Sequence, residues 1–177
     1  DYQDFLSPLS NPIIVLFFGG FVLAQAVLKE GVDKAMASVI LRWFGGKPRM
    51  VMLGLMLITA LFSMWMSNTA TTAMMITLVV PMLAQVPKGD PLRKGLLLCI
   101  PFAANIGGMG TPIASPPNAV AVSFLQQAGY DISFLQWVLI AVPLMIFLLA
   151  FAWLLLGYLF TPQDPSIKLS AEQRSID

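Results

Sequence analysis

The sequence predicts an all-α membrane protein, and three observations carry this prediction. The chain is 58% hydrophobic, with a mean hydropathy of +0.81. Two of its long apolar stretches are interrupted near their middle by polar or helix-breaking residues. A span needs roughly 20 apolar residues, and four stretches without any charged side chain are long enough to cross or enter a bilayer: 5–28, 50–87, 95–130 and 132–163. We therefore expect transmembrane helices together with a re-entrant helical hairpin and a discontinuous helix.

Basic residues set the expected orientation of the chain. Lys and Arg cluster in the connection at 29–49, in the connection at 88–94 and in the tail at 168–174. The positive-inside rule places all three in the cytoplasm. The connection around 129–131 has no Lys or Arg, and the N-terminus carries only acidic side chains. We expect these last two segments on the opposite side of the membrane.

The charge-free stretches divide the chain into five segments. Residues 1–49 are expected to hold a first span at 12–28 and an amphipathic helix in the cytoplasmic interface, where apolar residues recur at helical spacing through 32–43. The remaining segments follow in order: a re-entrant hairpin at 50–87, a discontinuous helix at 88–130, a last span at 131–160, and a cytoplasmic tail or linker at 161–177.

The hairpin is predicted from length and orientation. Both ends of 50–87 are expected on the cytoplasmic side, so the segment must leave and re-enter the same face. Its arms, 50–66 and 70–86, are each ~25 Å long at ~1.5 Å per residue, which is short of a ~30 Å hydrocarbon core. Ser67, Asn68 and Thr69 would form a tip at membrane depth. Two complete spans with an exterior Ser-Asn-Thr turn are the alternative.

The second interruption lies at 105–118, where three glycines and three prolines occur in one window. Such a window cannot continue an α-helix, because Pro removes a donor and clashes while Gly exposes backbone. We expect one half-helix over 95–106, a second one that runs to about residue 128 with Asn118 as its cap, and extended backbone over 111–117.

Two broken helices near the middle of the membrane predict an ion and anion site. The C-terminal end of a half-helix offers carbonyl oxygens to a cation, and the N-terminal end of the next offers N–H groups to an anion. Ser67, Asn68, Ser115 and Asn118 add neutral oxygens, which suit sodium, as well as donors for a carboxylate or sulfate. Paired broken helices are typical of secondary transporters.

Missing residue types narrow the function further. The chain has no His, and no Asp or Glu lies in an apolar stretch, so proton relays lack their usual groups and coupling to sodium is favoured. Acid–base and metal-dependent catalysis also lack their side chains, which argues against an enzyme. A net charge of +1 gives no reason to expect a nucleic-acid partner. No cofactor is expected apart from the coupling ion.

Three motifs carry a family resemblance. Residues 62–72 read FSMWMSNTATT, residues 107–111 read GGMGT, and residues 115–118 read SPPN. In content, order and separation they resemble the divalent anion:sodium symporter family, which carries di- and tricarboxylates or sulfate. By this resemblance Ser63, Ser67 and Asn68 would hold one sodium together with the backbone near Ala114, a position where the family commonly has Gly.

The resemblance also implies a substrate site. Asn68, Thr69 and Ser115 would touch the substrate carboxylates, and a further set would support the site: Asn105, Gly108, Gly110, Thr111, Pro116, Pro117 and Asn118. Asn105 could bond either to the tip or to the ion. Ser63 could also serve helix packing, although it precedes Ser67 by four residues and so could share a helix face with it. Thr71 and Thr72 are interpreted as packing residues.

The family has two inverted repeats, each with its own Ser-Asn-Thr, whereas this chain has one. We therefore expect half of an inverted-repeat transporter, with the second repeat supplied by a longer polypeptide or by another chain. The implied function is sodium-coupled symport of a dianion such as succinate, citrate or sulfate, by an elevator motion within a homodimer in the bacterial inner membrane. A sodium-independent exchanger, and a passive channel or structural subunit, are the alternatives.

Overall fold

The computed structural model describes residues 46–163 continuously, together with residues 18, 19, 22, 25, 26, 29–31, 44 and 169. Most of the predicted first span and tail, and the whole interfacial helix at 32–43, lie outside the described residues. The described part is all-helical, as predicted, and its β structure is limited to an isolated bridge between Gly46 and Leu169. It has five helices: α4 (Pro48–Ser63), α5 (Asn68–Leu83), α6 (Pro91–Gly107), α7 (Pro116–Gln127) and α8 (Phe134–Leu159).

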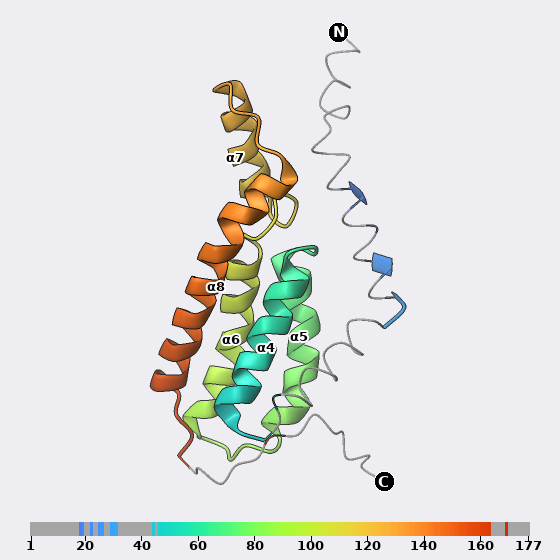
Figure 1. Ribbon diagram of the computed structural model, residues 1–177. Helices are drawn as coiled ribbons and strands as arrows, with labels where there is room; N and C mark the ends of the chain where they lie inside the picture. Colours follow the sequence, from blue (N-terminus) through green and yellow to red (C-terminus); the bar gives the residue numbers. More distant parts are fainter. Residues whose placement is uncertain are drawn as a thin grey trace.

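Helices α4 and α5 form a hairpin joined by the turn 64–67 (Figure 1), and we call residues 64–69 the tip. Pro48 stands in the first turn of α4, where its missing N–H has no intrahelical partner to lose. Ser67 caps α5, and its hydroxyl accepts a hydrogen bond from the Ala70 amide at 3.3 Å. Its φ and ψ of −62° and 143° are extended, so Ser67 ends the turn and α5 begins at Asn68. The predicted arms at 50–66 and 70–86 are therefore wrong in detail, because α4 ends at Ser63 and the Ser67 cap lets Asn68 and Thr69 enter α5.

Helices α6 and α7 follow one another along nearly the same line, separated by residues 108–115, which we call the break (Figure 1). The start of α7 differs from the prediction. Ser115 is its N-cap residue, and Pro116 and Pro117 belong to its first turn, because proline is pre-set for that position. Asn118 therefore lies inside the helix and does not cap it, and the extended backbone does not reach residue 117.

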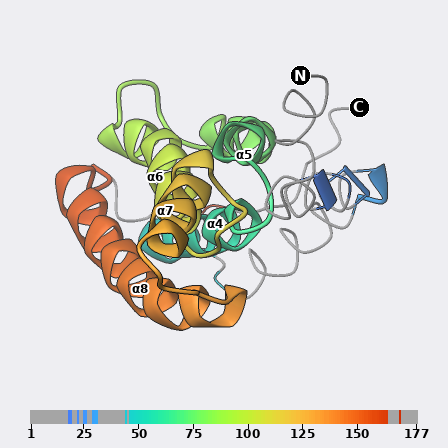
Figure 2. The same ribbon diagram turned by 90° about the horizontal axis from the view of Figure 1, so that it is seen from above.

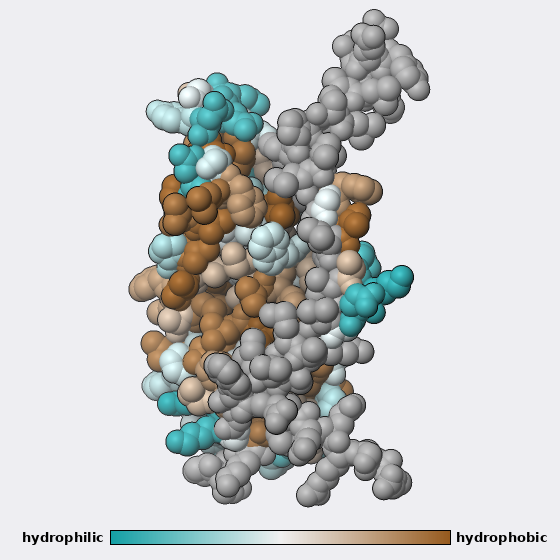
Figure 3. Space-filling view, turned by 45° about the vertical axis from the view of Figure 1, so that its right-hand side comes forward, coloured by the Kyte–Doolittle hydropathy of each residue, from teal (hydrophilic) through white to brown (hydrophobic). Residues whose placement is uncertain are grey.

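Helix α8 is the one helix among the described residues that is long and apolar enough to cross a membrane, with 26 residues and a mean hydropathy of 2.8 over its apolar window. A capping box formed by Ser133 and Gln136 fixes its start. Much of its apolar surface is exposed, and apolar side chains also gather over the middle of the face seen in Figure 3. Such a surface suits contact with lipid or with other membrane helices.

Helices α4 and α6 form the centre of the described bundle, with α5 and α8 on either side (Figure 2). The two central helices approach so closely that a Cβ built at Gly107 would overlap the backbone of Ala60. Small residues allow this backbone contact in membrane helix pairs. Both helices contribute large apolar side chains to the core, among them Met52, Leu55, Met56 and Ile58 from α4, and Leu92, Leu96, Cys99 and Ile100 from α6.

The hairpin tip and the break lie at a similar height in the bundle, while α7 and the first turns of α8 continue beyond them (Figure 1). The start of α4, the loop between α5 and α6 and the end of α8 gather at the opposite end (Figure 1). The basic residues of segments 47–49 and 88–94 therefore belong to one end of the bundle, and the connection at 128–133 belongs to the other.

Candidate ion and anion site

The hairpin tip packs against the C-terminal end of α6 through a buried hydroxyl. Ser63 is the last residue of α4 and is fully buried. Its Oγ lies 2.7 Å from Asn68 Oδ1 and 2.7 Å from the carbonyl oxygen of Ala104. The Ser63 hydroxyl of α4 is therefore within hydrogen-bonding distance of one oxygen from α5 and one from α6, and we call these three oxygens the oxygen cluster.

This cluster has more acceptors than protons. A serine hydroxyl has a single hydrogen, so Ser63 can donate to Asn68 or to Ala104 but not fully to both. Neutral hydroxyl, carboxamide and carbonyl oxygens are the ligands that hard cations prefer. The described residues contain no group of three or more His, Cys, Asp or Glu that could hold a metal ion. The donor set of this cluster therefore fits sodium better than a transition metal.

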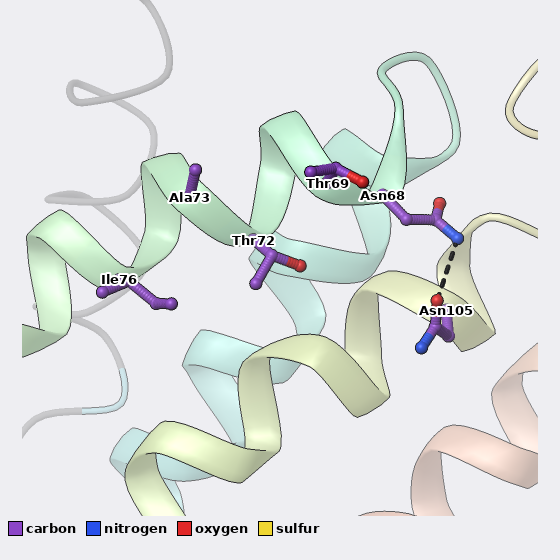
Figure 4. A pocket seen from close by; sticks show the side chains of 6 residues that line it. All are labelled: Asn68, Thr69, Thr72, Ala73, Ile76 and Asn105. Atoms are coloured by element: carbon purple, nitrogen blue, oxygen red, sulfur yellow. Dashed lines mark hydrogen bonds between the residues drawn. The ribbon is translucent and has the colours of Figure 1, made fainter.

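Asn68 is fixed from two sides. Its Nδ2 donates to Asn105 Oδ1 at 3.1 Å (Figure 4), so Asn105 contacts the tip; whether it also binds the ion stays a prediction. Gly108 lies against the other side, where a Cβ atom would overlap the Asn68 carboxamide. Glycine at 108 is thus required by close approach of the tip and not by an unusual φ.

Three further hydrogen bonds hold the break in place. Thr111 Oγ1 donates to the carbonyl of Met64 in the tip. Asn118 Nδ2 donates to the carbonyls of Gly108 at 2.7 Å and Thr111 at 2.8 Å. Because broken helices leave carbonyls without partners, Asn118 supports the break from within α7, a different task from the capping role that the sequence predicts for it.

Helix α8 also contacts both interrupted segments. The Trp137 indole N–H donates to the carbonyl of Met109 in the break at 3.0 Å. Trp65 in the tip packs against Phe134 with ring centroids 6.2 Å apart, a separation typical of aromatic pairs. Tip, break and the start of α8 therefore form one connected group of residues.

Among the described residues, no side-chain hydrogen bond joins the other predicted ligands, Ser67, Ala114 and Ser115, to the oxygen cluster. Ser67 caps α5 and does not share a helix face with Ser63, because α4 ends before it. Ala114 is buried in the break, with its N–H 3.4 Å from the Thr111 carbonyl, and Ser115 begins α7 without a side-chain cap bond. Within residues 46–163 no hydrogen bond joins Ala114 or Ser115 to the tip.

An open cavity of about 350 Å³ lies beside the tip. It is lined by six residues of α5 and α6: Asn68, Thr69, Thr72, Ala73, Ile76 and Asn105 (Figure 4). Amide and hydroxyl groups occupy the end nearest the tip, and aliphatic groups occupy the other end. Such a mixture of a few polar groups with apolar walls is typical of small-molecule sites.

Two features of the site were missed in the sequence. The first is the Ala104 carbonyl oxygen: the alanine side chain carries no polar group, so the residue type gave no reason to expect a ligand at this position. Thr72 was interpreted as packing, yet it lines the cavity. The spacing of Thr72 four residues after Asn68 is the signal that could have placed it on the cavity side.

Thr71, the other threonine interpreted as a packing residue, is fully buried, and its Oγ1 has no hydrogen-bond partner among the described residues.

A hairpin with a polar tip, packed against a broken helix beside an apolar span, defines the described part as a portion of a membrane transporter. The chain belongs to the citrate transporter family (CitMHS), whose model matches residues 1–174. This membership confirms the resemblance to the divalent anion:sodium symporters that the Ser-Asn-Thr and Gly-rich motifs carry. It also confirms the prediction that the chain is not an enzyme, because the family and the relatives below are transporters.

Curated relatives agree with this assignment. The chain is 41% identical over 166 residues to an uncharacterized transporter of Haemophilus influenzae, covering 93% of this chain and 34% of the relative. It is 34% identical over 169 residues to the sodium-dependent dicarboxylate transporter SdcS of Staphylococcus aureus (strain USA300), covering 89% and 32% respectively. An uncharacterized transporter of Schizosaccharomyces pombe is 35% identical, over 86% of this chain and 17% of its own length. The chain thus spans about a third or less of these relatives.

Proposed function

We propose that the complete protein is a sodium-coupled secondary symporter of divalent anions, with C4-dicarboxylates such as succinate as its most favoured substrates and citrate or sulfate as alternatives. The observation that carries this proposal is the buried cluster of Ser63, Asn68 and Ala104 oxygens at the hairpin tip. The family's description as a citrate transporter and the sodium-dependent dicarboxylate transport of the relative SdcS point to the same chemistry.

Sodium would bind between these three oxygens. A sodium ion there would interact with the oxygen atom to which the single hydroxyl hydrogen of Ser63 does not donate. Ser67 and the backbone near Ala114 would complete the proposed ligand set, as the family resemblance implies. Because Asn68 reaches both the cluster and the cavity, the ion would fix the Asn68 carboxamide before the anion arrives.

The anion would bind at the polar end of the cavity. Asn68 and Thr69 stand at the N-terminus of α5, where unpaired N–H groups and the positive end of the helix dipole favour negative charge. Asn105 lines the same end, and Ser115 at the start of α7 is the proposed contact from the break. The second carboxylate would be held by the opposite, inverted repeat.

The proposal includes a location and a motion. The bundle would lie in a membrane, the bacterial inner membrane by default, with the basic end in the cytoplasm. The tip would then be re-entrant, since α7 and the start of α8 continue beyond it (Figure 1). Helices α4 to α8 would move as one body in an elevator motion against a scaffold that also forms a homodimer. The contacts of α8 with tip and break support this division.

The test is uptake of labelled succinate by the full-length protein in proteoliposomes, with an inward sodium gradient compared with potassium. We expect sodium-dependent uptake that falls at least tenfold in Asn68→Ala, because the variant loses both the cluster and the cavity amide. Gln127→Ala, which removes an exposed carboxamide at the end of α7, is the matched control. Uptake that is indifferent to sodium would indicate an exchanger, and full activity of Asn68→Ala would indicate a channel or structural role for the tip.

A further inference from the structure

The cavity extends past the tip along one face of α5. Asn68, Thr72 and Ile76 are spaced four residues apart and share that face, and Ala73 lies four residues after Thr69. The lining therefore covers about two helical turns, or ~11 Å at ~5.4 Å per turn. The groups that the Ser-Asn-Thr motif supplies occupy only the first of these turns.

Thr72 differs from the other threonines of helices α4 and α5 outside the tip in lining the cavity with a hydroxyl that has no partner among the described residues: Thr71 also lacks a partner, but it is fully buried and does not line the cavity. Thr59 donates to the carbonyl of Leu55 at 2.6 Å, and Thr77 donates to the carbonyl of Met74 at 2.6 Å. Such bonds back to the preceding turn are the usual way for a helical threonine to satisfy its hydroxyl. Among the described residues the Thr72 hydroxyl makes no such bond, and the half-buried side chain lines the cavity.

The orientation of Thr72 adds to this. Figure 4 shows its hydroxyl directed toward the side of the cavity on which Asn105 lies, whereas Ile76 supplies an aliphatic wall one turn further on. Under the proposed function, a small dicarboxylate bound by one carboxylate at Asn68 and by the other at the opposite repeat would have its central carbons beside the cavity wall that Thr72 and Ile76 form. A substituent on a central carbon would then face the free hydroxyl.

We propose that Thr72 determines specificity for polycarboxylates that carry a hydroxyl group on the carbon chain. Its hydroxyl hydrogen-bonds to that substrate hydroxyl, and Ala73 with Ile76 packs against the adjacent carbons. A site that hydrogen-bonds a substrate hydroxyl discriminates against the analogue that lacks it, because the site group is left without a partner. This inference rests on the proposed function, since an anion must first bind at the tip.

The test compares malate with succinate, which differ by one hydroxyl, as competitors of labelled succinate uptake by the full-length protein. Thr72→Val keeps the shape of the side chain and removes the hydroxyl. We expect the malate-to-succinate affinity ratio to fall about five- to tenfold in this variant, as the loss of one hydrogen bond predicts. Thr72→Ser should stay within about twofold of wild type, and 2-methylsuccinate should compete equally well against wild type and Thr72→Val.

Controls separate the possible outcomes. Thr77→Val removes a hydroxyl from an exposed position on the same helix outside the cavity lining, and it should leave the ratio unchanged. Succinate uptake itself reports folding, and Thr72→Ala serves if Thr72→Val is not recovered. An unchanged ratio in an active Thr72 variant overturns this inference and leaves the proposed function standing. Absence of sodium-dependent succinate uptake by the wild-type protein overturns both.

Discussion

At the scale of single residues, the position of Asn68 depends on what its neighbours lack. Gly108 has no side chain, and the Asn68 carboxamide occupies the space where a Cβ would stand. The carboxamide can therefore reach Ser63 and Asn105 at the same time. Gly108, which has no side chain, thus sets the position of the Asn68 carboxamide in the proposed ion site.

Gly108→Ala should move Asn68 away from the cluster while leaving the rest of the fold in place. We expect sodium-dependent succinate uptake to fall at least tenfold, because a displaced carboxamide no longer presents its oxygen beside Ser63. Gly157→Ala is the matched control, since its added methyl would meet only ordinary contacts of 3.6 Å and beyond with Arg49. Equal uptake by the two variants would show that the position of Asn68 is not critical.

The residue scale also shows what the sequence could and could not predict about the site. Ser63 and Asn68 were predicted as ion ligands from the resemblance, and the structure places their oxygens 2.7 Å apart; whether they bind sodium stays a prediction. The geometric argument that Ser63 and Ser67 share a helix face was wrong, because α4 ends at Ser63. The Ala104 carbonyl could not be predicted, since every residue has a backbone oxygen and only packing selects one.

At the scale of elements, the contact between α4 and α6 depends on Gly107. The backbones of these two helices meet at Ala60, with no room for a side chain. Close backbone contact of this kind takes the place of hydrophobic driving force between helices in a membrane. The hairpin is thereby held against the end of α6 at the height where the site forms.

Gly107→Ala should therefore lower the stability of the fold, because the added methyl group would meet the backbone of Ala60. Inserting a methyl group into a closed contact typically costs about 1–3 kcal/mol, so we expect the thermal unfolding midpoint in detergent to fall by several degrees. Gly157→Ala should leave the midpoint unchanged or raise it slightly, because alanine favours the helix. A Gly107→Ala protein as stable as the control would mean that α4 and α6 are not held this closely.

Element boundaries were predictable where breaker residues are unambiguous. The break at 108–115 falls at the Gly-rich motif, which cannot continue a helix. The hairpin turn was placed too late: it spans 64–67 and overlaps the predicted Ser-Asn-Thr tip at Ser67 alone, because Asn68 and Thr69 begin α5 behind the Ser67 cap. The start of α7 was placed too late, since Pro116 and Pro117 were read as breakers although a first helical turn accepts proline. Hydropathy alone could not show that the two interruptions touch, which depends on the hydrogen bond of Thr111 to Met64 and on the close approach of Gly108 to Asn68.

At the scale of the whole molecule, the proposed re-entrant hairpin makes a claim about depth. The connection at 128–133 lies at the far end of the bundle, and the tip does not reach it (Figure 1). Trp65 in the tip and Tyr130 in that connection are both exposed in the described structure, at 48% and 66%. Two complete spans would instead bring both residues to the same side of the membrane in water.

Cysteine labelling from outside the cell distinguishes these arrangements. We expect a membrane-impermeant maleimide to modify Tyr130→Cys at least tenfold faster than Trp65→Cys, because a re-entrant tip lies within the protein at membrane depth. The native Cys99 is fully buried and should contribute little background. Similar rates at the two positions would support two complete spans with an exterior turn.

The central claim is that sodium binds the buried oxygen cluster and thereby prepares the anion site. The most direct measurement is the sodium concentration that gives half-maximal succinate uptake, compared between the full-length wild type and Ser63→Ala. We expect this concentration to rise about tenfold or more, because hydrogen bonds and contacts to charged groups are worth more than neutral ones. Thr59→Val, which removes a buried hydroxyl one turn earlier on α4, should leave it unchanged. An identical sodium dependence in wild type and Ser63→Ala would contradict the claim.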